Sequence, residues 1–558
     1  MKNNPSPLTR FYHLLQLDKK DIYQVILYAI FSGIVSLSLP LGIQAIINLI
    51  QGGRVSLSWI ILVFVVVIGV ILSGILRLMQ MRITENIQQK IFTRSSFEFG
   101  YRFPKIKFDA IYNQYAPELA NRFFDTMSIQ KGVSSLILEY SAAFLQIVFS
   151  LILLSLYHPF FIVFGFMLFM LLYFIFKFSF KAGLESSIKE SKFKYKVAHW
   201  LQEIARNQIT FKNESHHHFA LDKNNHLVEG YLKHRETHFG VLVRQFTQLI
   251  GFKTIITASL LLIGGYLVIN QQMNIGQFVA AEIIIIGVIS SVEKIIVGLE
   301  TFYDVLTSIE KVGQVVDLEL EKDFNKKVEV DTTHNIELEL DNICYTFPDE
   351  RLPILKNINL KINQGERIYL EGKNGSGKST LIKIISGLIE PGSGFFYVND
   401  ENFRKVKWSE YRSNIGIVTT GQSTFEGTML ENITFKDKNI SNEKLRWVLE
   451  KTKLKDYLKT HAQGLDAPVF TDGKQIPSSI MQKIILARTI IYEPKLLILE
   501  DPTDRMDEEQ AKEIIDFLTN DENNWTIITV AKNDYWKQKC SRIITLDKGS
   551  IVSDQKIN

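Results

Sequence analysis

Long uncharged apolar runs alternate with charged segments over about the first 300 residues, a pattern that predicts helices crossing a membrane. Residues 22–50 carry no charge, which is long enough to cross the ~30 Å hydrocarbon core. Residues 140–176 contain no Asp, Glu, Lys or Arg and are too long for one helix, so His158–Pro159 is expected to divide them. The six predicted spans are residues 22–50, 59–76, two helices within 140–176, 242–270 and 276–304.

Basic residues predict the orientation of these spans. Segments 77–130 and 177–240 are rich in Lys and Arg, whereas the other connections are short and carry a single Arg between them. Because basic loops stay in the cytoplasm, we expect six spans with both termini cytoplasmic. The two basic segments are long, so we expect the adjoining spans to continue as helices below the membrane. They would end in turns near 115–125 and 200–211 that contact another domain, unless these are ordinary amphipathic loop helices.

Four charged residues in or directly beside the predicted spans are singled out, because a charge inside a span is costly and suggests function. They are Glu139, Lys253, Glu282 and Glu293. Lys253 and Glu293 lie at similar depth when counted from the turn at 270–276, so a structural ion pair is favoured. Glu282 has no partner at its depth and is a candidate for lining a polar cavity. The sequence does not decide what these four groups do.

Length, charge and cysteine content narrow the class of protein. A chain of 558 residues is expected to hold two or more domains, and a net charge of +4 gives no case for a nucleic-acid partner. Two cysteines, Cys344 and Cys540, favour neither a disulfide framework nor a cysteine metal site. For the cluster His216–His218, a solvated surface is favoured over a metal site. The N-terminus lacks the short apolar core of a cleavable signal peptide.

From residue 336 onward the pattern becomes that of a soluble α/β domain. The stretch IELELDNICYTF alternates apolar and polar residues with period two, as a half-buried strand does. The preceding residues 309–335 are charged and lack a long apolar run. We therefore divide the chain into a membrane domain, 1–310, a linker, 311–335, and a soluble domain, 336–558.

A phosphate-binding loop lies between a predicted strand, ERIYLEG, and a predicted helix, LIKIISGLI. The sequence GKNGSGKST fits the P-loop pattern, in which glycines let backbone N–H groups wrap around phosphates at a helix N-terminus. Lys378 is expected to pair with the outer phosphates, and the Ser379 hydroxyl to hold Mg²⁺. The predicted ATP-binding residues of this loop are Gly372, Lys373, Asn374, Gly375, Ser376, Gly377, Lys378, Ser379 and Thr380.

With six spans joined to this loop, the chain resembles an ATP-binding cassette (ABC) exporter half-transporter over nearly its whole length. The resemblance implies an all-α six-helix transmembrane domain fused to an α/β P-loop nucleotide-binding domain. The membrane half is most similar to type I secretion and peptide exporters. The resemblance also implies that Tyr345 stacks on adenine, although a plain strand aromatic is the alternative.

Residues 464–503 align without gaps with the family pattern and fix the register, in which departures stand out in three motifs. The signature motif, usually Leu-Ser-Gly-Gly-Gln, is here Ile476–Ile480, IPSSI. It normally caps the γ-phosphate held by the opposite subunit, and Pro477 removes an N–H while two serines add bulk. The Q-loop glutamine aligns with Thr420, with Gln422 two residues away. The switch histidine aligns with Lys532.

The family's two acids, Asp then Glu, are swapped in the stretch LLILEDPTD. The resemblance places Glu500 on the Mg²⁺ side and Asp501 in the position of the general base. An Asp base is one methylene short of the attacking water, and a displacement of ~1 Å can cost about 10²-fold in rate. We therefore expect ATP binding to be retained better than hydrolysis.

Two functions remain in competition at this point. The first is an exporter subunit that couples ATP binding and slow hydrolysis to export of a peptide or protein, with a lipid or drug as alternative cargo. The second is a hydrolysis-deficient ABC protein that acts as a scaffold or regulatory subunit of an export complex. Either would lie in the cytoplasmic membrane and pair with a second half-transporter, a homodimer being favoured over a heterodimer. Secretion would add a periplasmic adaptor and an outer-membrane channel.

Overall fold

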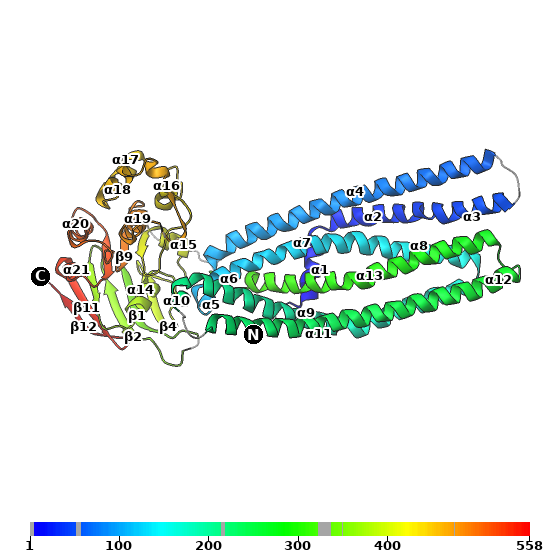
Figure 1. Ribbon diagram of the computed structural model, residues 1–558. Helices are drawn as coiled ribbons and strands as arrows, with labels where there is room; N and C mark the ends of the chain where they lie inside the picture. The colour runs from blue at the N-terminus through cyan, green and yellow to red at the C-terminus, as the bar shows by residue number, and fades with distance from the viewer. Residues whose placement is uncertain are drawn as a thin grey trace. The chain divides into compact units, whose positions relative to one another are not determined.

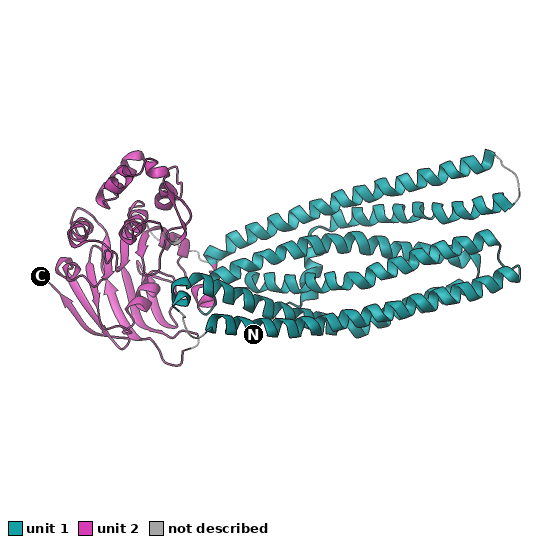
Figure 2. Ribbon diagram, viewed as in Figure 1, with its two compact units in different colours: residues 1–105, 113–318 teal, residues 106–112, 319–558 magenta. Residues whose placement is uncertain are grey.

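The computed structural model describes residues 5–51, 57–213, 218–321, 336–348, 350–473 and 475–557. Contacts within the chain define two compact units (Figure 2). Unit 1 holds residues 1–105 and 113–318, and unit 2 holds residues 106–112 and 319–558. Residues 322–335 of the predicted linker, and His216 and His217 of the histidine cluster, lie outside the described residues.

Unit 1 is built from long helices that run roughly along one direction (Figure 1). Short 3₁₀ or π turns continue several of them, at Phe103–Lys105, Arg122–Phe124, Leu136–Tyr140 and Leu260–Gly264. Its helices are α1 (Pro7–Leu17), α2 (Lys19–Ser36), α3 (Ser38–Gln51), α4 (Leu57–Arg102), α6 (Ala116–Asn121), α7 (Asp125–Ser135), α8 (Ser141–Tyr157), α9 (Phe160–Arg206), α10 (Gln208–Lys212), α11 (Phe219–Ser259), α12 (Gly265–Ile269) and α13 (Ile275–Val316). The last helix therefore continues six residues past the predicted domain boundary at 310.

Six helical stretches of the described chain are long and apolar enough to cross a membrane, which confirms the six predicted spans. They are Lys19–Gln51, Leu57–Lys105, Ala116–Tyr157, Phe160–Arg206, Phe219–Ile269 and Ile275–Val316. Helices α4 and α9 hold 46 and 47 residues. At ~1.5 Å per residue each is about 70 Å long, more than twice the ~30 Å hydrocarbon core. The predicted continuation of the spans beyond the membrane is confirmed.

Helix α13 forms the centre of the bundle and packs against α1, α3, α7, α8 and α9. Small residues let neighbouring helices approach it closely, as is common where lipid removes the hydrophobic driving force for packing. A Cβ added at Gly132 would collide with Val305, and one added at Gly183 would collide with the Tyr303 ring. Both glycines therefore set how near α7 and α9 lie to α13.

The charges inside the spans are largely paired. Lys253 on α11 forms the predicted ion pair with Glu293 on α13. Glu139 lies 3.2 Å from Arg77 and 3.7 Å from Lys294. Glu282 has neither an ion pair nor a side-chain hydrogen bond to another described residue, so it alone of the four stays a candidate for a polar cavity. Pairing lowers the cost of a charge in lipid, and a structural role explains the first three.

Unit 2 contains a six-stranded sheet in the order β12-β11-β3-β10-β9-β6 and a four-stranded antiparallel sheet in the order β2-β1-β4-β5. In the larger sheet β11, β3, β10, β9 and β6 are parallel, and β12 pairs antiparallel with β11. The strands are β1 (Leu338–Tyr345), β2 (Leu355–Ile362), β3 (Arg367–Glu371), β4 (Ser393–Val398), β5 (Glu401–Asn402), β6 (Ile415–Val418), β7 (Gly427–Thr428), β8 (Pro468–Val469), β9 (Leu496–Glu500), β10 (Thr526–Val530), β11 (Arg542–Asp547) and β12 (Ser550–Lys556).

The helices of unit 2 pack around these sheets (Figure 1). They are α5 (Phe108–Ile111), α14 (Lys378–Ile385), α15 (Trp408–Ser413), α16 (Met429–Thr434), α17 (Asn442–Lys451), α18 (Lys455–Lys459), α19 (Ser478–Ile490), α20 (Glu508–Leu518) and α21 (Asp534–Lys539). Strand β9 is buried along its whole length, as expected for a central parallel strand. The carboxyl ends of β3, β6, β9 and β10 meet at one edge of the sheet, where ligands of α/β proteins bind.

A short segment from the first basic stretch, residues 106–112, belongs to unit 2 by its contacts. The Lys107 backbone N–H donates to the Glu319 carbonyl at 2.9 Å, and the Lys107 amine lies 3.3 Å from the Glu319 carboxylate and 3.6 Å from that of Glu390. Lys383 of α14 lies over the ring of Phe108, 4.8 Å from its centre. Residues 106–112 are therefore a part of the first basic segment that packs with the nucleotide domain, and contact by the predicted turn near 115–125 stays a prediction. Contact by the 200–211 turn stays a prediction.

Candidate nucleotide site

The P-loop joins β3 to α14, and its three glycines have φ values of +151°, +80° and +102°. These values lie in the left-handed region, which other residues rarely adopt. A Cβ at Gly372 would also meet the Leu546 carbonyl, and one at Gly377 would meet the Leu355 side chain at 2.7 Å. The loop thus needs glycine both for its backbone conformation and for space.

Lys378 begins α14 and folds back onto this loop. Its amine donates to the Gly372 carbonyl at 2.5 Å and to the Lys373 carbonyl at 3.0 Å. Asn374 and Lys373 are exposed, whereas Ser376 and Thr380 are buried. The positive amine and the N-terminus of α14 lie on the same loop, which is the arrangement that binds phosphate.

Glu500, the last residue of β9, is 6% exposed and accepts three hydrogen bonds. One comes from the hydroxyl of Ser379 in the P-loop. The other two come from Thr420, whose hydroxyl lies 3.0 Å and whose backbone nitrogen lies 3.1 Å from the carboxylate. Three segments that are far apart in the sequence are therefore joined at one carboxylate. A buried carboxylate needs such donors to offset its loss of solvation.

Gln422, which could have replaced the family's Q-loop glutamine, is engaged elsewhere. Its amide nitrogen donates to the Ile417 carbonyl at 3.3 Å, and its amide oxygen accepts from the Thr419 nitrogen at 3.5 Å. Thr420 contacts Glu500 instead. Glu500 is one methylene longer than the family's aspartate, and Thr420 is shorter than glutamine, so the two departures compensate in length.

The same three residues fit a magnesium site. Magnesium prefers hard oxygen ligands and binds few protein carboxylates besides the phosphates of a nucleotide. Ser379 and Thr420 present hydroxyl oxygens around the single carboxylate of Glu500. The donor set is therefore suitable for Mg²⁺, and Thr420 is a member that the sequence did not assign to it.

Asp501 follows the end of β9 with a φ of +49°, a left-handed conformation fixed by two hydrogen bonds of its backbone. Its nitrogen donates to the Val530 carbonyl at 2.7 Å, and its carbonyl accepts from the Gln482 amide at 2.6 Å. Burial, and then the nearby carboxylate of Asp504, raise the pKa of Asp501 to about 6. This carboxyl is thus ionised at neutral pH and takes up a proton below pH 6.

Lys532, after the end of β10, lies beside these acids. Its amine is 3.2 Å from Asp504, and its side chain is 82% exposed. Asp504 raises the pKa of Lys532, so the amine carries a positive charge at neutral pH. A cavity of about 300 Å³ is lined by residues that include Thr420, Glu500, Asp501, Asp504 and Lys532. The structure therefore brings together the predicted acids and the residue at the switch position.

Asp504 and Gln482 belong to this site but were not singled out from the sequence. Asp504 is the third acid of LLILEDPTD, so a count of carboxylates in that stretch could have found it. Gln482 had no such signal, because it acts through α19, whose position depends on the tertiary fold. Its amide also accepts from the Arg505 backbone N–H at 3.0 Å, so it holds both ends of the loop after β9.

The signature segment surrounds the start of α19. Pro477 precedes the helix in an extended conformation, and Ser478 begins it. Ile480 is 8% exposed, so it packs into the core. The N-terminus of α19 is thus kept, with a proline in front and an apolar side chain in its first turn. Contact of this end with a nucleotide of a second subunit stays a prediction.

Tyr345 lies at the end of β1 with its ring 4% exposed. Its hydroxyl donates to Asp109 at 2.6 Å, and the Phe347 ring covers it edge-on at 5.1 Å. Phe347 in turn stacks on Tyr112, with ring centres 4.3 Å apart. In this conformation Tyr345 is buried, which favours a strand aromatic. Its stacking on adenine stays a prediction.

Two family models match the chain. The ABC transporter transmembrane region covers residues 22–292, and the ABC transporter model covers residues 355–504, which include the P-loop and both acids. The chain belongs to the ABC transporter family. Six spans joined to one nucleotide-binding domain make this ABC protein a half-transporter of the exporter type, and a multi-pass membrane protein that binds ATP.

Curated relatives of this ABC exporter are toxin translocation proteins. The alpha-hemolysin translocation ATP-binding protein HlyB of Escherichia coli O157:H7 is 26% identical over 302 residues, which is 54% of this chain and 42% of that protein. The leukotoxin translocation ATP-binding protein LktB of Mannheimia haemolytica is 27% identical over 322 residues, 58% of this chain and 45% of that protein. The chain thus spans less than half the length of these relatives.

A solved structure of a bacterial Atm1-family ABC exporter with ATP bound is similar to this ABC exporter over 96% of this chain and 95% of that chain. The TM-score is 0.85 at 15% sequence identity. At that identity the likeness concerns the fold alone. It confirms the predicted fold class, an all-α membrane domain followed by an α/β nucleotide-binding domain.

Replacing Thr420 by Val is predicted to weaken binding of the Mg²⁺–nucleotide complex about 10-fold, because Glu500 loses a hydroxyl donor while the shape is kept. Nucleotide binding in EDTA should not change. Titration of a fluorescent ATP analogue, with and without Mg²⁺, measures both. Thr419→Val is the matched control, since no side-chain hydrogen bond joins Thr419 to Glu500 in the described structure. Equal Mg²⁺ dependence of the three proteins would contradict the role of Thr420.

ATP turnover is predicted to rise with pH through about 6 if Asp501 accepts a proton, because that carboxyl must be ionised to act as a base. Asp504→Asn should move the midpoint to lower pH, since it removes a neighbouring carboxylate that raises the pKa of Asp501. Lys532→Ala should move it to higher pH, since the ammonium lowers that pKa. Shifts in the same direction, or a profile flat from pH 5 to 8, would contradict this assignment.

Proposed function

We propose that this chain is an exporter subunit that binds Mg²⁺–ATP, hydrolyses it slowly and moves a peptide or protein across the cytoplasmic membrane. The observation that carries the proposal is the cluster of Ser379, Glu500 and Thr420 beside a complete P-loop. This arrangement would keep a place for the metal and the phosphates although two family residues are replaced. Both termini would lie in the cytoplasm, as the basic segments predict.

Each residue of the site has a separate task in this proposal. The P-loop amides and Lys378 would bind the phosphates, and Ser379, Glu500 and Thr420 would hold Mg²⁺, which neutralises phosphate charge. Asp501 is the candidate base for the attacking water. Lys532 would place a positive charge near the terminal phosphate, where the family has a histidine. Asp504 would keep that ammonium beside Asp501.

The type of dimer decides whether the IPSSI signature and the swapped acids occur in the same ATP site. In ABC transporters each composite site pairs the P-loop of one subunit with the signature of the other. A homodimer of this chain would carry the IPSSI signature and the swapped acids in both sites. A heterodimer with a complete partner would keep one departure in each site, so a partner would not restore the family pattern. We propose the homodimer, because it needs no second gene product.

A second candidate is a subunit that binds ATP without useful turnover and acts as a scaffold or regulator of an export complex. The observation that favours it is the signature segment, where Pro477 and buried Ile480 stand at the start of α19. The short base at Asp501 points the same way. Loss of transition-state contacts would reduce hydrolysis far more than binding. The two candidates therefore differ in turnover and not in affinity.

The proposed cargo rests on the chain's similarity to HlyB and LktB, whose names describe them as translocation proteins for two toxins. A peptide or protein cargo would require a periplasmic adaptor and an outer-membrane channel in a two-membrane cell. Genes for such proteins beside this one would support secretion. A lipid or drug cargo is the alternative, and would need neither.

Turnover of Mg²⁺–ATP is measured for the purified protein in lipid and for its Lys378→Ala variant. The unmodified protein is predicted to turn over ATP slowly, but faster than the variant. Nucleotide binding is followed in the same samples, because the variant loses the amine that contacts the phosphates. Turnover that disappears in the variant would establish the ATPase and favour the exporter. If the protein binds nucleotide but turns over ATP no faster than the variant, the exporter proposal is contradicted, and the scaffold or regulatory subunit that binds ATP without useful turnover remains.

A further inference from the structure

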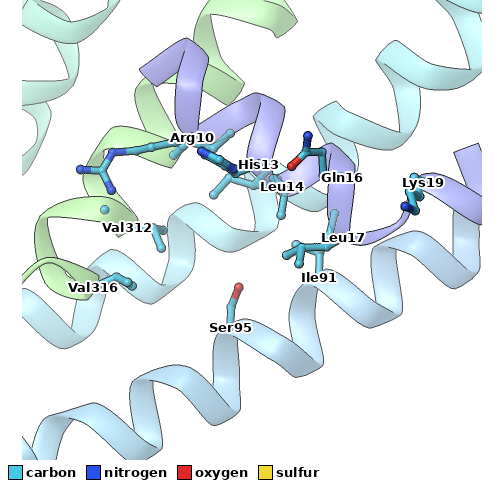
Figure 3. Close-up of a pocket in the computed structure, with 13 residues that line it drawn as sticks. Arg10, His13, Leu14, Gln16, Leu17, Lys19, Ile91, Ser95, Val312 and Val316 are labelled. Carbon is cyan, nitrogen blue, oxygen red and sulfur yellow. The ribbon is translucent and has the colours of Figure 1, made fainter. Parts of the chain in front are cut away.

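A cavity of about 670 Å³ lies in unit 1 beneath the N-terminal helix α1 (Figure 3). Helix α1 covers it, α4 and α7 contribute two walls, and α13 closes another side. In Figure 3, Leu14 and Leu17 of α1 lie opposite Ile91 of α4, with Val312 of α13 to one side. A cavity of this volume is in the range that holds a ligand the size of a small amphiphile.

The walls and the rim of the cavity differ in chemistry. The walls are mainly aliphatic and include Ile91, Ile129 and Ile309, each less than 10% exposed, with Ser95 of α4 as a polar member. The rim carries His13 and Lys19, both exposed. An aliphatic interior with the ammonium of Lys19 and the imidazole of His13 at its edge matches a molecule with a hydrocarbon part and an anionic head.

The acidic side chains near this rim form ion pairs with other basic residues, so they do not pair with Lys19. Arg10 binds Asp317 in a bidentate pair and lies 3.7 Å from Glu310. The Arg94 guanidinium donates to the Asp18 carboxylate at 3.0 Å, and Lys90 pairs with Asp21. No ion pair joins Lys19 or His13 to another described residue.

The cavity lies beside the start of the first candidate span. Lys19 lines the cavity and is the first residue of that span, Lys19–Gln51. Helix α1, immediately before it, exposes Leu8, Tyr12 and Leu17, whose side chains are 43%, 61% and 62% exposed. Apolar side chains exposed on a helix beside the start of a span are typical of a helix lying in the membrane interface. The neighbour of the cavity is therefore the boundary between lipid headgroups and acyl chains.

We propose that this cavity binds an anionic phospholipid of the surrounding bilayer. Lys19 and His13 hold the phosphate of its headgroup, and an acyl chain lies against Leu14, Ile91 and Ile309. Basic pockets at the membrane surface are a known means of recognising anionic headgroups. The lipid would join α1 to α4 and α13, which otherwise leave a hollow between them. The inference does not depend on whether ATP is hydrolysed.

The test uses the full-length protein in detergent, titrated with phosphatidylglycerol or phosphatidylcholine and analysed by native mass spectrometry. Phosphatidylglycerol is expected to bind more tightly to the unmodified protein. Lys19→Gln should lower that affinity about 5-fold, the effect of one Lys near an anionic headgroup. Lys20→Gln is the matched control, because Lys20 is adjacent but does not line the cavity.

A second variant keeps the test decisive if Lys19→Gln folds poorly. Ser95→Phe places a ring inside the cavity and should remove tight phosphatidylglycerol binding without changing any charge. Equal losses from Lys19→Gln and Lys20→Gln would overturn the proposal, as would equal binding of the two lipids. Competition by glycerol phosphate at the same concentration as the lipid would also overturn it, because it would show a site for free phosphate.

Discussion

The hydrogen bonds to the carboxylate of Glu500 are the interaction on which the nucleotide site depends. This carboxylate ends a strand that is buried along its whole length, and it joins the P-loop, through Ser379, to the loop after β6, through Thr420. Without these donors a buried carboxylate would be strongly unfavourable. The longer acid and the shorter polar residue match each other in reach. Each replacement looks damaging when it is considered alone. Taken together, Glu500 and Thr420 still reach each other and keep the contact at this site.

The compensation does not extend to the chemistry of hydrolysis. No lengthened neighbouring side chain makes up for the missing methylene of Asp501, and burial and Asp504 raise the pKa of its carboxyl to about 6. Lys532 supplies a fixed positive charge where the family has a group that can exchange a proton. These departures affect residues proposed to act in ATP hydrolysis, and they leave the proposed ATP-binding residues of the P-loop unchanged. Under the proposed function, ATP would bind to the nucleotide domain readily and be hydrolysed slowly.

Much of the architecture could be predicted because its signals are local. The spans follow from uncharged runs, the P-loop from one short motif between a strand and a helix, and the Lys253–Glu293 pair from counting along two helices. The grouping of residues 106–112 with the nucleotide domain was not predicted. Helix α4 ends at Arg102, and the short pieces that follow, including α5, lack the periodicity that would mark them.

Features of the site that depend on tertiary contacts could not be predicted. Thr420 is 80 residues from Glu500 in the sequence, and only the parallel order of β6 and β9 brings them together. The burial of Tyr345 follows from a register shift in β1 between Leu340 and Ile343, which a simple alternation does not show. Asp504 and Gln482 were missed because their importance lies in what they contact.

A double-mutant cycle between Glu500 and Thr420 tests the central claim most directly. Mg²⁺-dependent nucleotide affinity is measured for the unmodified protein, Glu500→Asp, Thr420→Gln and the variant with both changes. If the two side chains are matched in length, each single change weakens binding and the double change restores much of it, with a coupling of about 1–2 kcal/mol. Additive losses would show that the two positions act independently, and would contradict the account of a rearranged but intact metal site.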